Sequence, residues 1–270
     1  MKIYIFIVLA LLTSLTGCIN HSKKQELAQS EIPPTLVDTT GTVKFTSDSL
    51  QISEIDSLAF TYLKTSTAYQ PDTLYTISDF EKVKKMLEGR VVFAGYNEHA
   101  ALDSTIDGPF VSSIQFKNGK LHYYETYDSI EQVKRVTDVA FVTYCPSEDI
   151  LLCEGGHTSD YSFNLTTGEQ GGEVGNPNCI RYNQSQTIRL NGYFPGQECE
   201  EYFIQKKNNS GFKTIFNLRD FFAFLEKENL YFCFISDVFW RGDNKMYFKH
   251  IYYPSAVPIS KFYAITINKI

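Results

Sequence analysis

Short apolar runs separated by tight-turn sequences recur along this chain, and this pattern restricts its fold more than any other feature. In residues 113–124, Asn118-Gly119 divides two apolar runs. Asn-Gly in such a setting is the strongest short-range signal for a two-residue β-hairpin. Further turns lie at 146–149, 183–186 and 242–244. We therefore predict a mainly β fold of antiparallel sheets built from repeated hairpins.

Only two or three short helices are expected between the hairpins. Ser78-Asp79-Phe80-Glu81 matches a capping box, which predicts a helix that ends at Gly89. A second helix is predicted over 218–228, with Asn229 as its stop. Residues 48–65 fit either a helix or an edge strand.

The composition agrees with a β fold and opposes nucleic-acid binding. Aromatic residues make up 15% of the 270 residues, and aromatic side chains favour half-buried pleated surfaces. The formal net charge is -6, and no basic stripe is present. Nucleic-acid binding depends on clustered Lys and Arg, so no nucleic-acid partner is expected. No cofactor is expected.

The N-terminal residues are organised as a secretory signal peptide. Lys2 gives a short positive start, and residues 3–12 form an apolar run too short to span a bilayer. Leu15-Thr16-Gly17-Cys18 follows, and it resembles the lipobox of bacterial lipoproteins. The resemblance implies that residues 1–17 are removed and that Cys18 receives diacylglycerol and a further acyl chain such as palmitate. Two or three acyl chains give an anchor that one chain cannot.

The chain is expected to divide into a signal peptide (1–17), a flexible tether (18–42) and a single β-rich globular domain (43–270). The tether is polar and contains Pro33-Pro34. No Asp directly follows Cys18. By resemblance to Gram-negative lipoprotein sorting, this predicts an extracytoplasmic, lipid-anchored protein on the outer membrane facing the periplasm.

Five thiols remain after lipidation of Cys18, so at most two disulfides can form. They belong to Cys145, Cys153, Cys179, Cys199 and Cys233. An oxidising compartment permits disulfides, while an unpaired Cys often serves as a small buried hydrophobe. None of the spacings is CxxC, so the sequence supports neither a zinc ribbon nor a thioredoxin-like motif.

The hairpins within 138–253 look like one unit used repeatedly. Gly155-Gly156-His157 leads to an apolar run at 161–165, and Pro195-Gly196-Gln197 leads to another at 202–204. This order of strand, turn and further strands resembles blades of TolB-like and WD-type β-propellers, although the WD dipeptide is absent. The resemblance implies a propeller-like arrangement, and the alternative is unrelated hairpins in a sandwich or open sheet.

Residues 153–160 are the best place in the sequence for catalysis, because Glu154, His157 and Asp160 lie there beside glycines. A Ser nucleophile needs a His and a carboxylate that converge in space, and a metal needs three or four ligands. Polar residues on one loop rarely converge in that way. A polar turn between strands is therefore the favoured interpretation, and no metal site is expected.

Two further groups have a functional and a structural interpretation. Glu198, Glu200 and Glu201 surround Cys199, and a solvated strand edge is favoured over a calcium site because the EF-hand pattern is missing. Trp240 could stack on a sugar or peptide, but core packing is favoured.

Six Asp-Ser/Thr tripeptides before residue 131 resemble the sequon of periplasmic O-glycosylation in some Gram-negative lineages. Their candidate acceptors are Thr39, Ser49, Ser57, Thr73, Ser104 and Ser129. Asp-Ser is also a common start of a turn or helix, which is the alternative explanation.

Three functional hypotheses follow. The first is a non-enzymatic, membrane-tethered binding or scaffolding module for an envelope protein or a glycan. The second is an envelope hydrolase with a site near Glu154, His157 and Asp160. The third is an inhibitor or immunity protein that blocks a toxin or lysozyme.

Overall fold

The structure, a computed structural model, separates Met1–Leu36 from a compact unit at Val37–Ile270. The described residues all belong to this second unit. They are 41–68, 74–99, 102–117, 119, 121–123, 125–128, 133–136, 139–196, 199–227, 233–252 and 258–268. The predicted signal peptide, Cys18 and the tether up to residue 40 lie outside them. No helix among the described residues is long and apolar enough to cross a membrane.

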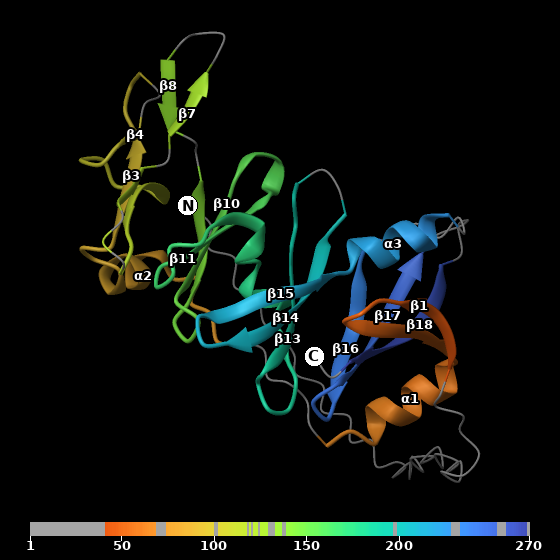
Figure 1. Cartoon of the computed structure of the whole chain (residues 1–270). Coiled ribbons are helices and arrows are strands. Elements are labelled where there is room, and N and C mark those ends of the chain that lie inside the picture. The colour runs from red at the N-terminus through yellow and green to blue at the C-terminus, as the bar shows by residue number, and fades with distance from the viewer. Residues whose placement is uncertain are drawn as a thin grey trace, which may run out of the picture. The chain divides into compact units, whose positions relative to one another are not determined.

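A five-stranded antiparallel sheet combines the first and last described strands of the chain (Figure 1). Its order is β1 (Thr42–Thr46), β2 (Leu50–Ile55), β18 (Ile259–Ile267), β17 (Lys245–Tyr252) and β16 (Ile235–Arg241). Helix α1 (Ser57–Thr65) follows β2 directly. The ambiguous segment 48–65 therefore contains both a strand and a helix, and the strand is internal because it pairs with β1 and β18.

A seven-stranded antiparallel sheet follows in the chain. Its order is β11 (Asp160–Asn164), β10 (Ile150–Glu154), β9 (Ala140–Cys145), β5 (Phe110–Gln115), β3 (Val91–Tyr96) and β4 (Leu102–Asp103), and β6 (Leu121–Tyr123) also pairs with β5. Strands β7 (Glu125–Asp128) and β8 (Val133–Val136) form a separate pair. The hairpins predicted around 118–119 and 146–149 are confirmed.

A four-stranded antiparallel sheet completes the fold. Its order is β12 (Arg181–Tyr182), β13 (Ile188–Tyr193), β14 (Glu201–Asn208) and β15 (Gly211–Asn217). Short 3-10 helices lie before it at η2 (Gly156–Thr158), η3 (Gly171–Glu173) and η4 (Pro177–Cys179). The prediction of a mainly β fold with antiparallel sheets is confirmed.

The two predicted helices form with small changes at their ends. Helix α2 (Phe80–Met86) starts one residue later than the capping box implies, because the carboxylate of Asp79 accepts from the Lys82 amide. The Ser78 hydroxyl donates to Thr143 instead, at 3.2 Å. Helix α3 (Arg219–Glu226) ends before the predicted stop, Asn229, which lies outside the described residues.

The largest core lies between the five-stranded sheet, the four-stranded sheet and α3. Trp240, Phe248 and Tyr263 contribute to it from the five-stranded sheet, and Phe221 contributes from α3. These side chains are fully buried. Full burial of an aromatic side chain stabilises a fold by about 1.5–3 kcal/mol, so this cluster holds α3 against both sheets.

Candidate functional site

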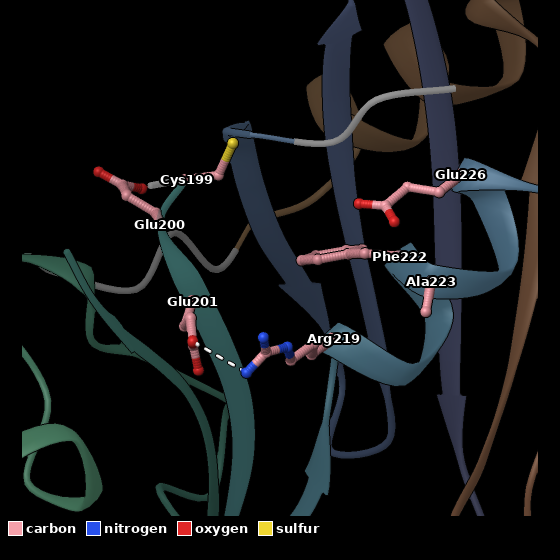
Figure 2. A pocket seen from close by; sticks show the side chains of 7 residues that line it. All are labelled: Cys199, Glu200, Glu201, Arg219, Phe222, Ala223 and Glu226. Atoms are coloured by element: carbon pink, nitrogen blue, oxygen red, sulfur yellow. Dashed lines mark hydrogen bonds and ion pairs between the residues drawn. The ribbon is translucent and has the colours of Figure 1, made fainter. Parts of the chain in front are cut away.

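A cavity of about 370 Å³ opens beside α3, and its lining combines charged and aromatic groups. One wall is the start of β14 and the other is α3 (Figure 2). Its lining residues are Cys199, Glu200, Glu201, Arg219, Phe222, Ala223 and Glu226. Three carboxylates and one guanidinium give the lining a formal charge of -2.

The helix supplies both the positive and the apolar part of the cavity. Arg219 lies in the first turn of α3, and its Nη1 reaches Glu201 Oε1 at 3.4 Å across the opening (Figure 2). Phe222 and Ala223 line the cavity one turn later, and Phe222 is buried. Residues three and four positions apart share one face of a helix. Arg219, Phe222 and Glu226 therefore point to the same side.

Glu200 has the most perturbed environment in the lining. Burial and the nearby charge of Asp160 raise the pKa of its carboxyl above the ordinary value of 4.5. The Tyr202 hydroxyl donates to the same carboxyl. Glu200 also lines a second, smaller cavity of about 220 Å³, together with Cys179 and Arg181. A single carboxyl group thus belongs to both cavities.

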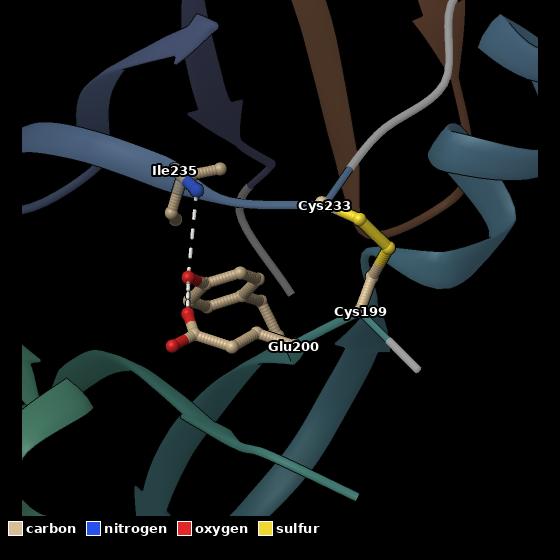
Figure 3. Close-up of a disulfide and its surroundings, with 5 residues drawn as sticks. Cys199, Glu200, Cys233 and Ile235 are labelled. Carbon is tan, nitrogen blue, oxygen red and sulfur yellow. Dashed lines mark hydrogen bonds between the residues drawn. A yellow bond between two sulfur atoms is a disulfide. The ribbon is translucent and has the colours of Figure 1, made fainter. Parts of the chain in front are cut away.

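A disulfide closes the rim of the first cavity. Cys199 precedes β14 and Cys233 precedes β16, and their Cα atoms are 4.4 Å apart (Figure 3). This spacing lies within the range that a disulfide requires. Beside it, the Ile235 amide donates to the Tyr202 hydroxyl at 3.4 Å. The bond therefore joins the four-stranded sheet to the five-stranded sheet at the cavity.

The other described cysteines are free thiols. Cys145 and Cys153 are buried, which fits the expectation of small buried hydrophobes. Cys179 lines the second cavity, and burial raises the pKa of its thiol to about 12. A thiol with such a pKa remains protonated at neutral pH and is a poor nucleophile.

The structure places the three polar candidates of the loop at 153–160 in different settings. Glu154 is exposed at the end of β10, and His157 is exposed within η2 at a positive φ of 58°. The Asp160 carboxylate instead accepts bonds from the Asn176 amide group at 2.9 Å and the Phe194 amide at 2.8 Å. Asp160 therefore ties two loops together, as expected of a structural turn. Other residues line the cavity beside α3 and the second cavity.

Trp240 lies in the core. Its side chain is 0% exposed, and its indole Nε1 donates to the Arg181 carbonyl at 2.9 Å. A ring that stacks on a ligand needs an exposed face, so the placement corresponds to the core-packing interpretation.

The candidate glycan acceptors differ in accessibility. Ser49 is half-buried and donates to the Ile215 carbonyl at 3.2 Å, whereas Ser57 and Ser104 are exposed. Asp56 is the N-cap of α1, accepting from the Ala59 amide at 2.7 Å, which is the structural role that an Asp-Ser pair often has. Thr39, Thr73 and Ser129 lie outside the described residues.

The cavity was only partly visible in the sequence. Glu198, Glu200 and Glu201 stood out as an acidic cluster, of which Glu198 lies outside the described residues. The predicted solvated strand edge is wrong for Glu201, because β14 lies between β13 and β15. Arg219 and Glu226 gave no signal beyond an amphipathic helix. Their convergence on Cys199 depends on how α3 packs, which no local pattern encodes.

The described residues hold no group of three or more His, Cys, Asp or Glu side chains arranged to bind a metal ion. The arrangement beside α3 can hold a ligand by charge, hydrogen bonds and contact with Phe222. The chain matches no protein-family model, and comparison with curated proteins and with solved structures found no significant match.

Proposed function

We propose that this chain is an exported, lipid-anchored binding module of the cell envelope, and that the cavity beside α3 is its binding site. The observation that carries this proposal is the Cys199–Cys233 disulfide at the cavity rim. Disulfides persist in oxidising compartments and are rare in the cytosol. The bond therefore supports the same extracytoplasmic location as Leu15-Thr16-Gly17-Cys18.

The lining of the cavity favours a positively charged group on the partner. Glu200, Glu201 and Glu226 outnumber the one cation, Arg219, and Phe222 offers an aromatic surface nearby. A Lys or Arg side chain combines a charge with an apolar stem, so it can satisfy the carboxylates and cover the ring. We propose a basic segment of another envelope protein as the ligand.

The anchor is tested by replacing Cys18 with Ser in the full chain. The native chain should fractionate with membranes and incorporate labelled palmitate, and C18S should remain an unprocessed precursor without label. A C18S chain that is processed and membrane-bound like the native chain would contradict the lipid anchor. Cys145→Ser is a matched control, since it removes a thiol from the globular domain only.

The binding site is tested with short peptides of known charge. Nuclear magnetic resonance titration with a Lys-containing tripeptide should shift the signals of Ala223 and Glu226, and the matched Glu-containing tripeptide should not. The double variant E201Q/E226Q should weaken binding of the Lys peptide about tenfold. Glu81→Gln with Glu88→Gln, one in α2 and one in the turn after it, removes the same charge elsewhere. Equal shifts with both peptides would contradict a charge-selective site.

Two further parts of this proposal concern glycosylation and the arrangement of the sheets. Exposure makes Ser57 and Ser104 the described acceptors best placed for a glycan. Mass spectrometry that finds both peptides only unmodified would refute glycosylation at these two residues.

A propeller-like arrangement is supported by the pairing of β2 with β18, because a ring of sheets needs its first and last strands in one sheet.

A further inference from the structure

Glu200 differs from the other two carboxylates in the lining of the cavity beside α3. Glu201 already pairs with Arg219 at 3.4 Å, and Glu226 is exposed to water. Glu200 is half-buried, and among the described residues no Lys or Arg forms an ion pair with it. A carboxylate taken out of water without an opposite charge is costly. Glu200 is therefore the carboxylate of this lining that gains most from a cation on the partner.

Arg181 lines the second cavity together with Glu200, but it does not supply the opposite charge. Its Nη1 donates to the backbone carbonyls of Asn178 and Ile180, at 2.7 Å each. These two bonds hold the guanidinium at the backbone of its own segment. The described part of the site thus leaves the charge of Glu200 to be balanced by a ligand.

The Glu200 carboxyl is held in place by two successive hydrogen bonds (Figure 3). It accepts from the Tyr202 hydroxyl, which itself accepts from the Ile235 amide at 3.4 Å. A carboxyl group keeps acceptor capacity whether or not it carries a proton. A change in the protonation of Glu200 therefore alters its charge without breaking this arrangement.

Asp160 places a second negative charge close to Glu200. Its carboxylate is fixed by the bonds that it accepts from Asn176 and Phe194. Burial of Glu200 and the charge of Asp160 raise the pKa of the Glu200 carboxyl. At mildly acidic pH Glu200 therefore carries a proton more often than an ordinary Glu side chain does, and this proton neutralises the carboxyl when no cation is bound.

We infer that Glu200 is the specificity-determining carboxyl of this site, and that a Lys or Arg side chain of the partner binds there in exchange for a proton. The inference rests on the proposed function, and it names a residue and a form of regulation for the same site. In the exchange, the protonated carboxyl releases its proton to water. The resulting carboxylate pairs with the cation, which keeps all of its own protons. A lower pH favours the protonated carboxyl, so it weakens binding of the cation.

Other charged or titratable groups surround Glu200 on the neighbouring elements. They are His157 in η2, which lies beside Gly196, Asp160 in β11, Cys179 in η4, Arg181 in β12, Glu201 and Tyr202 in β14, Arg219 and Glu226 in α3, and Asp237 in β16. The Cys179 thiol stays protonated near neutral pH, because burial raises its pKa to about 12. Histidine side chains commonly titrate between pH 5 and pH 7, so His157 requires its own control.

The test is a nuclear magnetic resonance titration of the full chain with the Lys-containing tripeptide at pH 7, pH 6 and pH 5. We expect the affinity of the native chain to fall about threefold between pH 7 and pH 5. E200Q should bind about tenfold more weakly at pH 7 and should change little with pH. Gln has the size of Glu, and its carbonyl can still accept from the Tyr202 hydroxyl. The variant therefore removes the charge and keeps the hydrogen bond.

E201Q is the matched control, because it removes the same charge from the neighbouring residue of the same cavity. Glu201 already has Arg219 as its partner. E201Q should therefore lose less affinity than E200Q and keep the pH dependence of the native chain. H157Q should keep both the affinity and the pH dependence, since His157 lines neither cavity.

A pH-stat titration measures the exchanged protons directly. At pH 5, addition of the tripeptide to the native chain should release protons, and the release should vanish at pH 7, where the carboxyl is already ionised. E201Q should release as many protons as the native chain. This comparison does not use E200Q, so it tests the inference even if E200Q does not fold.

The outcomes separate this inference from the proposed function. If the peptide binds the native chain and E200Q with equal affinity at every pH, the role of Glu200 is overturned and the charge-selective cavity stands. Binding to the native chain without release of protons at pH 5 would overturn the exchange in the same way. If the peptide binds neither the native chain nor any variant, the inference and the proposed ligand class are both overturned.

Discussion

Two adjacent carboxylates, Glu148 and Asp149, connect the turn between β9 and β10 to different parts of the fold. Glu148 accepts from Arg189 at 2.7 Å and from the Tyr182 hydroxyl. Asp149 accepts two bonds from the Arg90 guanidinium, at 3.0 and 2.8 Å. Bidentate, charge-assisted bonds are among the strongest in proteins. A turn predicted from Pro146 to Asp149 is therefore also a connection between sheets.

Removing Arg189 should destabilise the protein strongly. Its side chain is 6% exposed, and it also donates to Gln205 at 2.7 Å and covers the Phe212 ring at 4.0 Å. We expect R189M to lower the free energy of unfolding by about 3–5 kcal/mol, because Glu148 loses its charged partner.

Urea denaturation measures this loss. K64M removes one partner of the exposed pair with Asp237 and should cost less than about 1 kcal/mol. R189M/E148Q should recover part of the loss because no unpaired charge remains. An R189M loss no larger than that of K64M would show that the pair is not structural.

Asp149 should make stability depend on acid pH. Burial acts to raise the pKa of its carboxyl, but hydrogen bonds from Arg90, Thr166 and Tyr144 outweigh burial and lower it below 3.8. Because the folded pKa lies below the unfolded one, this stabilisation is complete above the unfolded value and is lost as the pH falls through the folded value.

The variant D149N tests this sign, since Asn tolerates the positive φ of 54° at this position. We expect D149N to be about 1.5–3 kcal/mol less stable than the native chain at pH 7. The difference should shrink below about pH 4. The test is to measure the free energy of unfolding of D149N and of the native chain between pH 2 and 7. A difference that does not change with pH would contradict a stabilising role of the Asp149 carboxylate.

At the scale of elements, three edge strands of the sheets pair with an irregular register. Strands β1 and β16 are the outer strands of the five-stranded sheet, and β15 is an outer strand of the four-stranded sheet. Each of these three strands shows a register shift against its neighbour in the sheet. In β1 the shift lies between Val43 and Phe45. Bulges and charged side chains on edges hinder pairing with another chain. These edges are therefore protected.

Replacing Lys44 should expose the edge of β1. Lys44 lies at the bulge and pairs with Glu54 at 3.3 Å. We expect K44V to self-associate, because Val43, Val at 44 and Phe45 would form an apolar edge. Sedimentation velocity should show an average mass that rises with concentration above that of the native chain. K245V, on the inner strand β17, is the control, and equal association of both variants would argue against an edge effect.

At the scale of the whole compact unit, turns connect the sheets. Asn183 is fully buried between β12 and β13, and its side-chain amide donates to the Asp243 carbonyl at 2.9 Å. The Ser185 amide donates to the Asp243 carboxylate at 2.8 Å. The turn of one hairpin is thus fixed by the turn of another, which links the four-stranded and five-stranded sheets.

Replacing Asn183 should make the four-stranded and five-stranded sheets unfold less cooperatively. We expect N183A to lose about 2–4 kcal/mol, because several buried hydrogen bonds disappear together. Amide hydrogen exchange should then proceed at different rates in the five-stranded sheet and the four-stranded sheet. Asn164 accepts from Thr166 and Thr167 within a single turn, so N164A should lower stability without uncoupling the sheets. Uniform exchange in N183A would rule out the linking role.

Local sequence signals determined most of the elements. The turns at 118–119, 146–149, 183–186 and 242–244 and the apolar face of α3 were predicted because backbone preferences and apolar periodicity act over only a few residues. The exact N-cap of α2 and the strand and helix within 48–65 were not resolved. Neighbouring polar residues compete for the same cap, and a short apolar run fits either element.

Tertiary structure alone decided the cavity, the disulfide and the links between turns. Cys199 and Cys233 are 34 residues apart, and Asn183 and Asp243 are 60 residues apart. Five cysteines allow many pairings, and an acidic cluster has the same local pattern on an edge as in a cavity. Which residues meet depends on how the sheets and α3 bury their apolar faces together, and that burial is a property of the whole packed core rather than of any segment.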